Sequence, residues 1–156
     1  MITIPQFLDF PTDTDAKEVV SLFLRLMELK NHDLFLHSQQ VANYAVAAAA
    51  KMGLPRSEVN CIKMAALLHD IGQLAISNTI LAKYPYFNTR EQAAYRRHCM
   101  AGASMLENIP AFGHIRKIVL HHHENWDGSG YPRRLKGVNI PIGSRIIAVC
   151  NFYDRK

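Results

Sequence analysis

The sequence has few cysteines, no long apolar run and no secretory start. Its three cysteines, Cys61, Cys99 and Cys150, are odd in number, lie far apart and form no CxxC pair, which predicts reduced thiols in a cytoplasmic protein. No segment approaches ~18 uninterrupted apolar residues, so we expect no membrane-spanning helix. The first ten residues lack the basic start of a signal peptide and contain Pro5 and Asp9.

A strong charge of one sign is also lacking, since the formal net charge is only +5. This mild excess favours an anionic partner, but we expect neither nucleic acid nor a membrane. The basic residues between positions 116 and 145 are compatible with a solvated face. With 49% hydrophobic and 20% charged residues, the composition is typical of a globular protein. We expect one domain over residues 14–156, preceded by a lead-in at residues 1–13.

The apolar residues follow helical spacing, and no strand pattern of convincing length occurs. Steps of three and four residues predict helices at about 15–30, 33–52, 55–70, 90–107, 110–123 and 142–156, with an irregular segment at 73–88. Thr89 and Gln92 have the spacing of a capping box at the start of the fourth helix. The predicted fold class is all-α, a bundle of six or seven helices.

Histidine is the unusual residue type, with eight in 156 residues. Four predicted helices each carry histidine toward the centre: His37, His69, His98 and the run His121–His123. A single histidine on an apolar stripe is usually an ordinary core residue. Several buried imidazoles in one small domain need a common partner, because burying unpaired polar groups costs free energy. A metal cluster supplies that partner, and histidine with aspartate favours Fe, Mn or Zn over Ca or Mg.

Five segments, several of which contain these histidines, follow one another in a fixed order. They are Ala65 to Gly72 around the pair His69-Asp70, His98 with Gly102, His122 to Pro132, Leu135 to Pro141, and Arg145-Ile146 leading to Tyr153-Asp154. Together with His37-Ser38 and Val41, they resemble the HD-GYP family, a branch of the HD superfamily of metal-dependent phosphohydrolases, over about residues 33–154. The resemblance implies an HD-type helical bundle around a metal site. It also implies hydrolysis of cyclic di-GMP to pGpG, GMP or both.

The resemblance implies a set of metal ligands, position by position. They are His37, His69, Asp70, His98, His122 and His123. From their order along the chain we expect His98 and His123 at one ion and His37 and His69 at another, with Asp70 bridging. Asp33 lies one helical turn before His37, where members with three metals have a carboxylate. We therefore expect two divalent transition metals, Fe or Mn as the first choice, and leave a third open.

A glycine-rich loop and the basic residues near it are candidates for substrate contact. Glycine allows close backbone approach, and an aromatic ring or a cation can contact a nucleotide. The candidate substrate-binding residues are Gly128, Gly130, Tyr131, Pro132, Arg133 and Arg145. An alternative is that the loop is a rigid turn that braces the helix ends. The family resemblance also points to a regulatory or cyclase domain as a partner, and a dimer is left open.

Two positions depart from the family pattern. Gln73 stands where the family usually has a lysine, and Asn151 stands where it has a metal-binding aspartate. We take Asp70 and Gln73 as the catalytic pair and Asn151 as a neutral ligand. Two functions remain open: a phosphodiesterase for a cyclic dinucleotide or another phosphoester with a modified site, or a degenerate domain that binds a nucleotide or a partner. The family usually continues beyond Tyr153-Asp154, so the C-terminal end leaves truncation open.

Overall fold

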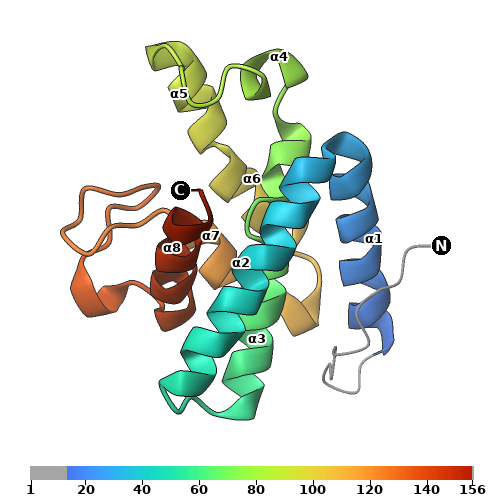
Figure 1. Cartoon of the computed structure of the whole chain (residues 1–156), viewed down its shortest axis with the longest axis vertical. Helices are drawn as coiled ribbons and strands as arrows, with labels where there is room; N and C mark the ends of the chain where they lie inside the picture. The colour runs from blue at the N-terminus through green and yellow to red at the C-terminus, as the bar shows by residue number, and fades with distance from the viewer. Residues whose placement is uncertain (1–13, 156) are drawn as a thin grey trace.

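The computed structural model describes residues 14–155, and these residues form helices joined by turns and loops (Figure 1). The α-helices are α1 Thr14–Lys30, α2 His32–Lys51, α3 Arg56–Leu68, α4 Asn78–Leu81, α5 Thr89–Arg96, α6 His98–Met105, α7 Gly113–His121 and α8 Ile142–Asp154. The 3-10 helices are η1 Ile71–Ala75, η2 Pro110–Phe112 and η3 Gly137–Asn139. The expected lead-in at residues 1–13 lies outside the described residues.

Helices α2 and α3 form the centre of the bundle and lie side by side (Figure 1). Small residues line their contact, with Ala45 and Ala49 on α2 and Ala65 and Ala66 on α3 fully buried. Alanine is the best helix former and lets two helix backbones approach closely. Helices α1, α7 and α8 pack around this pair, so the apolar core is shared by segments that are far apart in the sequence.

The predicted helix at 90–107 is two helices, because the chain makes a tight turn at Arg97. There the backbone N–H of Arg97 donates to Ala94, three residues earlier, which is a 3-10 bond and interrupts the α-helical pattern. The predicted capping box was one residue late. Asn88 accepts from the Glu91 backbone at 2.9 Å, and Glu91 accepts from the Asn88 backbone at 3.0 Å, consistent with asparagine being a preferred cap.

The fold class expected from the sequence is confirmed. Residues 14–155 contain no strand, and no helix in this range is long and apolar enough to cross a membrane. Cys61, Cys99 and Cys150 are free thiols. The predicted helix at 110–123 also exists, but its first turn is the 3-10 helix η2 and its last residues, His122 and His123, lie just beyond α7.

Candidate metal centre

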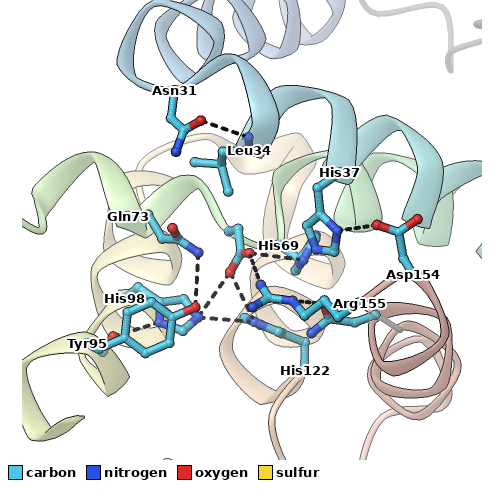
Figure 2. Close-up of polar contacts among 12 residues, drawn as sticks. Asn31, Leu34, His37, His69, Gln73, Tyr95, His98, His122, Asp154 and Arg155 are labelled. Carbon is cyan, nitrogen blue, oxygen red and sulfur yellow. Dashed lines mark hydrogen bonds and ion pairs between the residues drawn. The ribbon is translucent and has the colours of Figure 1, made fainter. Parts of the chain in front are cut away.

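Four helices bring histidines to one buried point. His37 comes from α2, His69 directly follows α3, His98 begins α6, and His122 directly follows α7. The last three of these side chains are fully buried. Figure 2 shows the rings turned toward one another between the helices. The convergence that the helical spacing predicted is therefore present in the folded chain.

Backbone carbonyls hold three of these rings in a defined orientation. In each case the ring Nδ1 lies 2.6–2.7 Å from the carbonyl oxygen three residues earlier, joining His69 to Ala66, His98 to Tyr95 and His122 to Val119. A carbonyl oxygen can only accept, so each Nδ1 carries the proton. Nε2 is then the ring atom that faces the centre in each case, which is how proteins present histidine to a metal.

The fourth ring is held by a carboxylate instead. Nδ1 of His37 lies 2.5 Å from Oδ2 of Asp154, so Nδ1–H donates a hydrogen bond to Asp154 and Nε2 of His37 is left to face His69. The two rings lie 5.4 Å apart between centroids. Asp154, near the end of α8, therefore orients a candidate ligand.

Asp70 lies between two groups of candidate donor atoms. Its Oδ1 is 3.2 Å from Nε2 of His98 and 3.7 Å from Nε2 of His122, whereas its Oδ2 is 3.4 Å from Nε2 of His69. The donors form one group of His98, Cys99, His122 and His123 and another of His37, His69 and Asp70, with atoms in each group within 4.8 Å of one another. The structure thus groups the histidines in the pairs expected from their order.

Several of these buried donor atoms lack a hydrogen-bond partner within residues 14–155. They are Nε2 of His37, His69 and His123, and Oδ1 of Asp70. A buried polar atom left unpaired costs about 1–3 kcal/mol, and four of them facing one centre have a common explanation in a bound cation. Imidazole nitrogens with one carboxylate are a typical donor set for transition metals. The residues therefore fit a metal centre.

The pKa shifts of Asp70, His122 and His123 agree with this donor set. Burial by itself would raise the pKa of Asp70, but His69, His122 and His98 together hold this pKa well below its usual range. Burial lowers the pKa of His122 to about 4 and also places the pKa of His123 well below normal. For His98, burial is the largest single effect and lowers the pKa, but the interactions with Asp70 and Cys99 together outweigh it and raise the pKa to about 10.

A cavity of about 540 Å³ opens onto the histidine cluster. Its wall includes His122 and His123 from the cluster, Asn151 and Arg155 from the end of the chain, and the side chains of Tyr84, Phe87, Gln92, Tyr95, Arg96 and Tyr131. Aromatic rings and two arginines therefore surround the approach to the metal ligands. This size and mixture are typical of a site for a small organic ligand.

A sequence model described as the HD domain matches residues 21–156. This chain belongs to the HD domain family. The membership predicted from the HD-GYP motifs is confirmed, and so is the HD-type helical fold. The chain is 37% identical over 141 residues to 3'3'-cGAMP-specific phosphodiesterase 2 of Vibrio cholerae, covering 89% of this chain and 27% of the relative. It is 36% identical over 139 residues to a cyclic di-GMP phosphodiesterase of Thermotoga maritima, covering 88% and 38%.

Solved structures of other HD proteins share the fold of this HD domain. A protein of the HDG"Y"P type from Bdellovibrio bacteriovorus matches with a TM-score of 0.68 at 19% identity, over 89% of this chain and 50% of that one. The HD domain of phosphodiesterase PgpH from Listeria monocytogenes, in complex with cyclic-di-AMP, matches with a TM-score of 0.63 at 18% identity, over 85% and 72%. The curated relatives are longer, and the chain spans about a quarter to two fifths of their length.

Two of the predicted metal ligands, Asp33 and Asn151, do not present a free donor atom to the cluster. Asp33 is exposed in the first turn of α2 and is in neither donor group of the described residues. The structure therefore gives no support to a third ion at Asp33. Asn151 is buried beside the cluster, but its Oδ1 accepts a hydrogen bond of 2.9 Å from Nε of Arg155.

We expect Asp33→Asn to leave bound metal and turnover within about twofold of the unchanged protein, because an exposed substitution away from the ligands has little effect. Elemental analysis of both proteins after identical loading with Mn²⁺ checks this. A loss of one ion per chain in the variant would show that Asp33 is a ligand after all.

The predicted catalytic residue Gln73 lies behind the cavity wall. It is buried in η1, and its Nε2 donates to the hydroxyl of Tyr95 at 3.3 Å. Tyr95 itself lines the cavity, whereas Gln73 does not. Gln73 is therefore placed to hold the Tyr95 side chain.

Close backbone contacts and hydrogen bonds hold most of the glycine-rich loop in one conformation. Gly128 has a φ of +84°, and a Cβ at Gly130 would lie 2.2–2.5 Å from backbone atoms of residues 123–125. The buried carboxylate of Glu124 accepts from the backbone N–H groups of Arg133 and Leu135 at 2.6 and 3.0 Å. These contacts support the rigid-turn alternative for the glycines.

Among the six candidate substrate-binding residues, Tyr131 is the one that lines the cavity. Its ring stacks on His123 at 4.8 Å, and the Arg96 guanidinium lies 4.9 Å above it. Arg133 is exposed, and Arg145 lies 5.7 Å from the centre of the Trp126 ring. The structure thus brings neither of these arginines, nor Gly128, Gly130 or Pro132, into the cavity wall.

Sequence reasoning missed two residues of the site. Cys99 is buried, and its Sγ lies 3.6 Å from Nε2 of His98; neighbours in a helix usually point in different directions, so no spacing signal marked it. Arg155 was also missed, although it stands four residues after Asn151, and positions i and i+4 share a helix face.

Proposed function

We propose that this HD domain is a metal-dependent phosphodiesterase that hydrolyses a cyclic dinucleotide, cyclic di-GMP first among them, to pGpG, GMP or both. The observation that carries the proposal is the set of inward-facing Nε2 atoms around Asp70 beside an open cavity of about 540 Å³. The relatives described above, a 3'3'-cGAMP-specific phosphodiesterase and a cyclic di-GMP phosphodiesterase, support the same substrate class. We assign this function to residues 14–156, with residues 1–13 as a lead-in.

The residues would hold two ions, Fe or Mn, one on each side of Asp70. His98, His122 and His123 with Oδ1 of Asp70 would form one site, and His37 and His69 with Oδ2 would form the other. When bound, such ions polarise a phosphate and lower the pKa of a water molecule. Asp154 keeps Nε2 of His37 directed inward, and Asp70, ionised despite its burial, is the charge shared by both sites.

The cavity wall supplies the contacts that a cyclic dinucleotide needs. Tyr84 and Phe87 bring aromatic rings to this wall, where a base could stack, and Arg96 brings a positive charge to the same wall. Stacking on an aromatic side chain contributes about 1–3 kcal/mol per base. The proposed role of Gln73 is to position Tyr95, since the Gln73 side chain does not reach the cavity.

A nucleotide-binding module without turnover is the second candidate. It is favoured by the neutral side chain of Asn151 next to the cluster and by the Arg155 guanidinium on Asp70. Both features lower the negative charge available to cations. A regulatory or cyclase domain as partner, a dimer and a cytoplasmic location stay predictions.

We expect the metal-loaded chain to convert cyclic di-GMP to pGpG or GMP in a long incubation with Mn²⁺ or Fe²⁺, because the ligand set on both sides of Asp70 is retained. Chromatography of the products checks this, with protein held in excess EDTA as the control. Parallel incubations with 3'3'-cGAMP and cyclic di-AMP rank the substrates. If the chain binds cyclic di-GMP tightly at saturating metal but forms no product, the proposed phosphodiesterase activity is contradicted and the nucleotide-binding module is favoured.

A further inference from the structure

Arg155 places a permanent positive charge against the candidate metal ligands. Its Nη2 lies 3.1 Å from Oδ2 of Asp70, and its Nε lies 2.9 Å from Oδ1 of Asn151. The guanidinium also lies 4.9 Å from the centre of the Tyr84 ring. Figure 2 shows the side chain reaching from the end of α8 toward the histidines. Three contacts thus hold one cation against Asp70, at the edge of the cluster.

The contacts of Arg155 are confined to one side of Asp70. Oδ2, which binds Arg155, is also the oxygen 3.4 Å from Nε2 of His69. Oδ1 faces His98 and His122 instead and has no hydrogen-bond partner within residues 14–155. The positive charge of Arg155 therefore lies in the half of the cluster formed by His37, His69 and Oδ2, whereas Oδ1 on the other side has no hydrogen-bond partner among these residues.

The charge of Arg155 makes the two halves of the cluster unequal in their affinity for a divalent ion. Arginine stays protonated at every accessible pH, and like charges a few ångströms apart inside a protein repel strongly. Within residues 14–155, the carboxylates that contact the histidines of the cluster are Asp70 and Asp154. An ion between His37 and His69 would have to take Oδ2 from Arg155 or share it.

We propose that Arg155 is a tethered cation that competes with the second metal ion for Oδ2 of Asp70. The HD domain then binds one ion tightly on the His98 side and a second on the His37 side only at higher free metal. Arg155 sets the occupancy of the second site. This inference rests on the metal centre of the proposed function, but it concerns binding of the ions and not turnover.

The test is a titration of the full chain with Mn²⁺ alone, without nucleotide, followed by the electron paramagnetic resonance signal of free Mn²⁺. The unchanged protein should show two sites whose Kd values differ by at least ~10-fold, a typical size for coupled sites. Arg155→Met should tighten the second site by about tenfold and leave the first within about threefold. Arg155→Gln, which is neutral but can still bond to Asn151, should behave in the same way, and a melting curve of each variant shows that it is folded.

Arg96→Met is the matched control, because it removes one arginine from the same cavity wall without touching Asp70. It should leave both Kd values within about threefold. Equal tightening by the Arg96 and Arg155 variants, unchanged Kd values in folded Arg155 variants, or two equally tight sites in the unchanged protein would each overturn the proposal. Weaker metal binding in the Arg155 variants would overturn it too, by showing that Arg155 holds Asp70 in place. Absence of hydrolysis with both sites filled would count against the proposed function alone.

Discussion

Asp70→Asn should abolish metal binding at both sites and lower the turnover of cyclic di-GMP by at least about a thousandfold, the size expected when a group central to transition-state stabilisation is removed. Asp70 is fully buried, and its two oxygens face different histidine groups. Asparagine has nearly the same shape but no charge, and only one of its two terminal atoms can ligate. The loss should therefore come from the ligand and not from the packing.

Elemental analysis and product chromatography on the same preparations check this prediction. Glu107→Gln is the matched control, because Glu107 is an exposed carboxylate paired with Arg116 at 2.8 Å. It should keep the metal content and the rate of the unchanged protein. An Asp70→Asn variant that keeps its metal ions would show that Asp70 does not link the two sites, and the shared centre would be wrong.

Gly72→Ala should destabilise the fold by about 3 kcal/mol or more, among the larger effects of single substitutions. A Cβ at Gly72 would lie 1.9 Å from the carbonyl oxygen of His98 and 2.6 Å from the backbone nitrogen of Gly102. These are backbone atoms of α6, so η1 and α6 would have to separate. This contact holds Asp70 and His98 at their present spacing, so metal binding should weaken as well.

Urea unfolding of the metal-free proteins measures this change in the free energy of unfolding. Gly113→Ala serves as the control, because Gly113 begins α7 and a Cβ there would meet nothing within 4 Å. Since alanine favours helix over glycine by up to about 1 kcal/mol, the control should be neutral or slightly stabilising. Equal stabilities for the two variants would refute the close contact between η1 and α6.

The parts of the fold that follow from periodicity were predictable. Apolar stripes gave the long helices α1 to α3 and the segments that carry α5 to α8, and the placement of His37, His69 and His98 on inward faces predicted their meeting. Helix ends were less accurate. The break at Arg97 depends on one tight turn beside the contact of Gly72 with His98, and a packing contact between distant segments has no signature in a single sequence.

The chemistry of the site was predictable only where the residue type determines it. The five inward-facing histidines and Asp70 can donate electron pairs to a metal ion because of their residue type. Their role was therefore predictable once they were expected to lie together in the core. The role of Asp154 could not be read from spacing, because it depends on α8 crossing α2 so that Oδ2 meets Nδ1 of His37. Similarly, Arg155 matters because the end of α8 lies against the end of α3, which only the tertiary structure shows.

The most direct test of the account is an anomalous difference map from crystals of this chain grown with Mn²⁺ and measured at the manganese absorption edge. We expect the strongest peak within about 3 Å of Oδ1 of Asp70 and of Nε2 of His98 and His122, which allows for small shifts from ordinary metal–ligand distances of about 2.0–2.2 Å. A second, weaker peak should lie toward His37 and His69. A map with no peak among these atoms, at a Mn²⁺ concentration that fills known manganese sites, would contradict a metal centre in this HD domain.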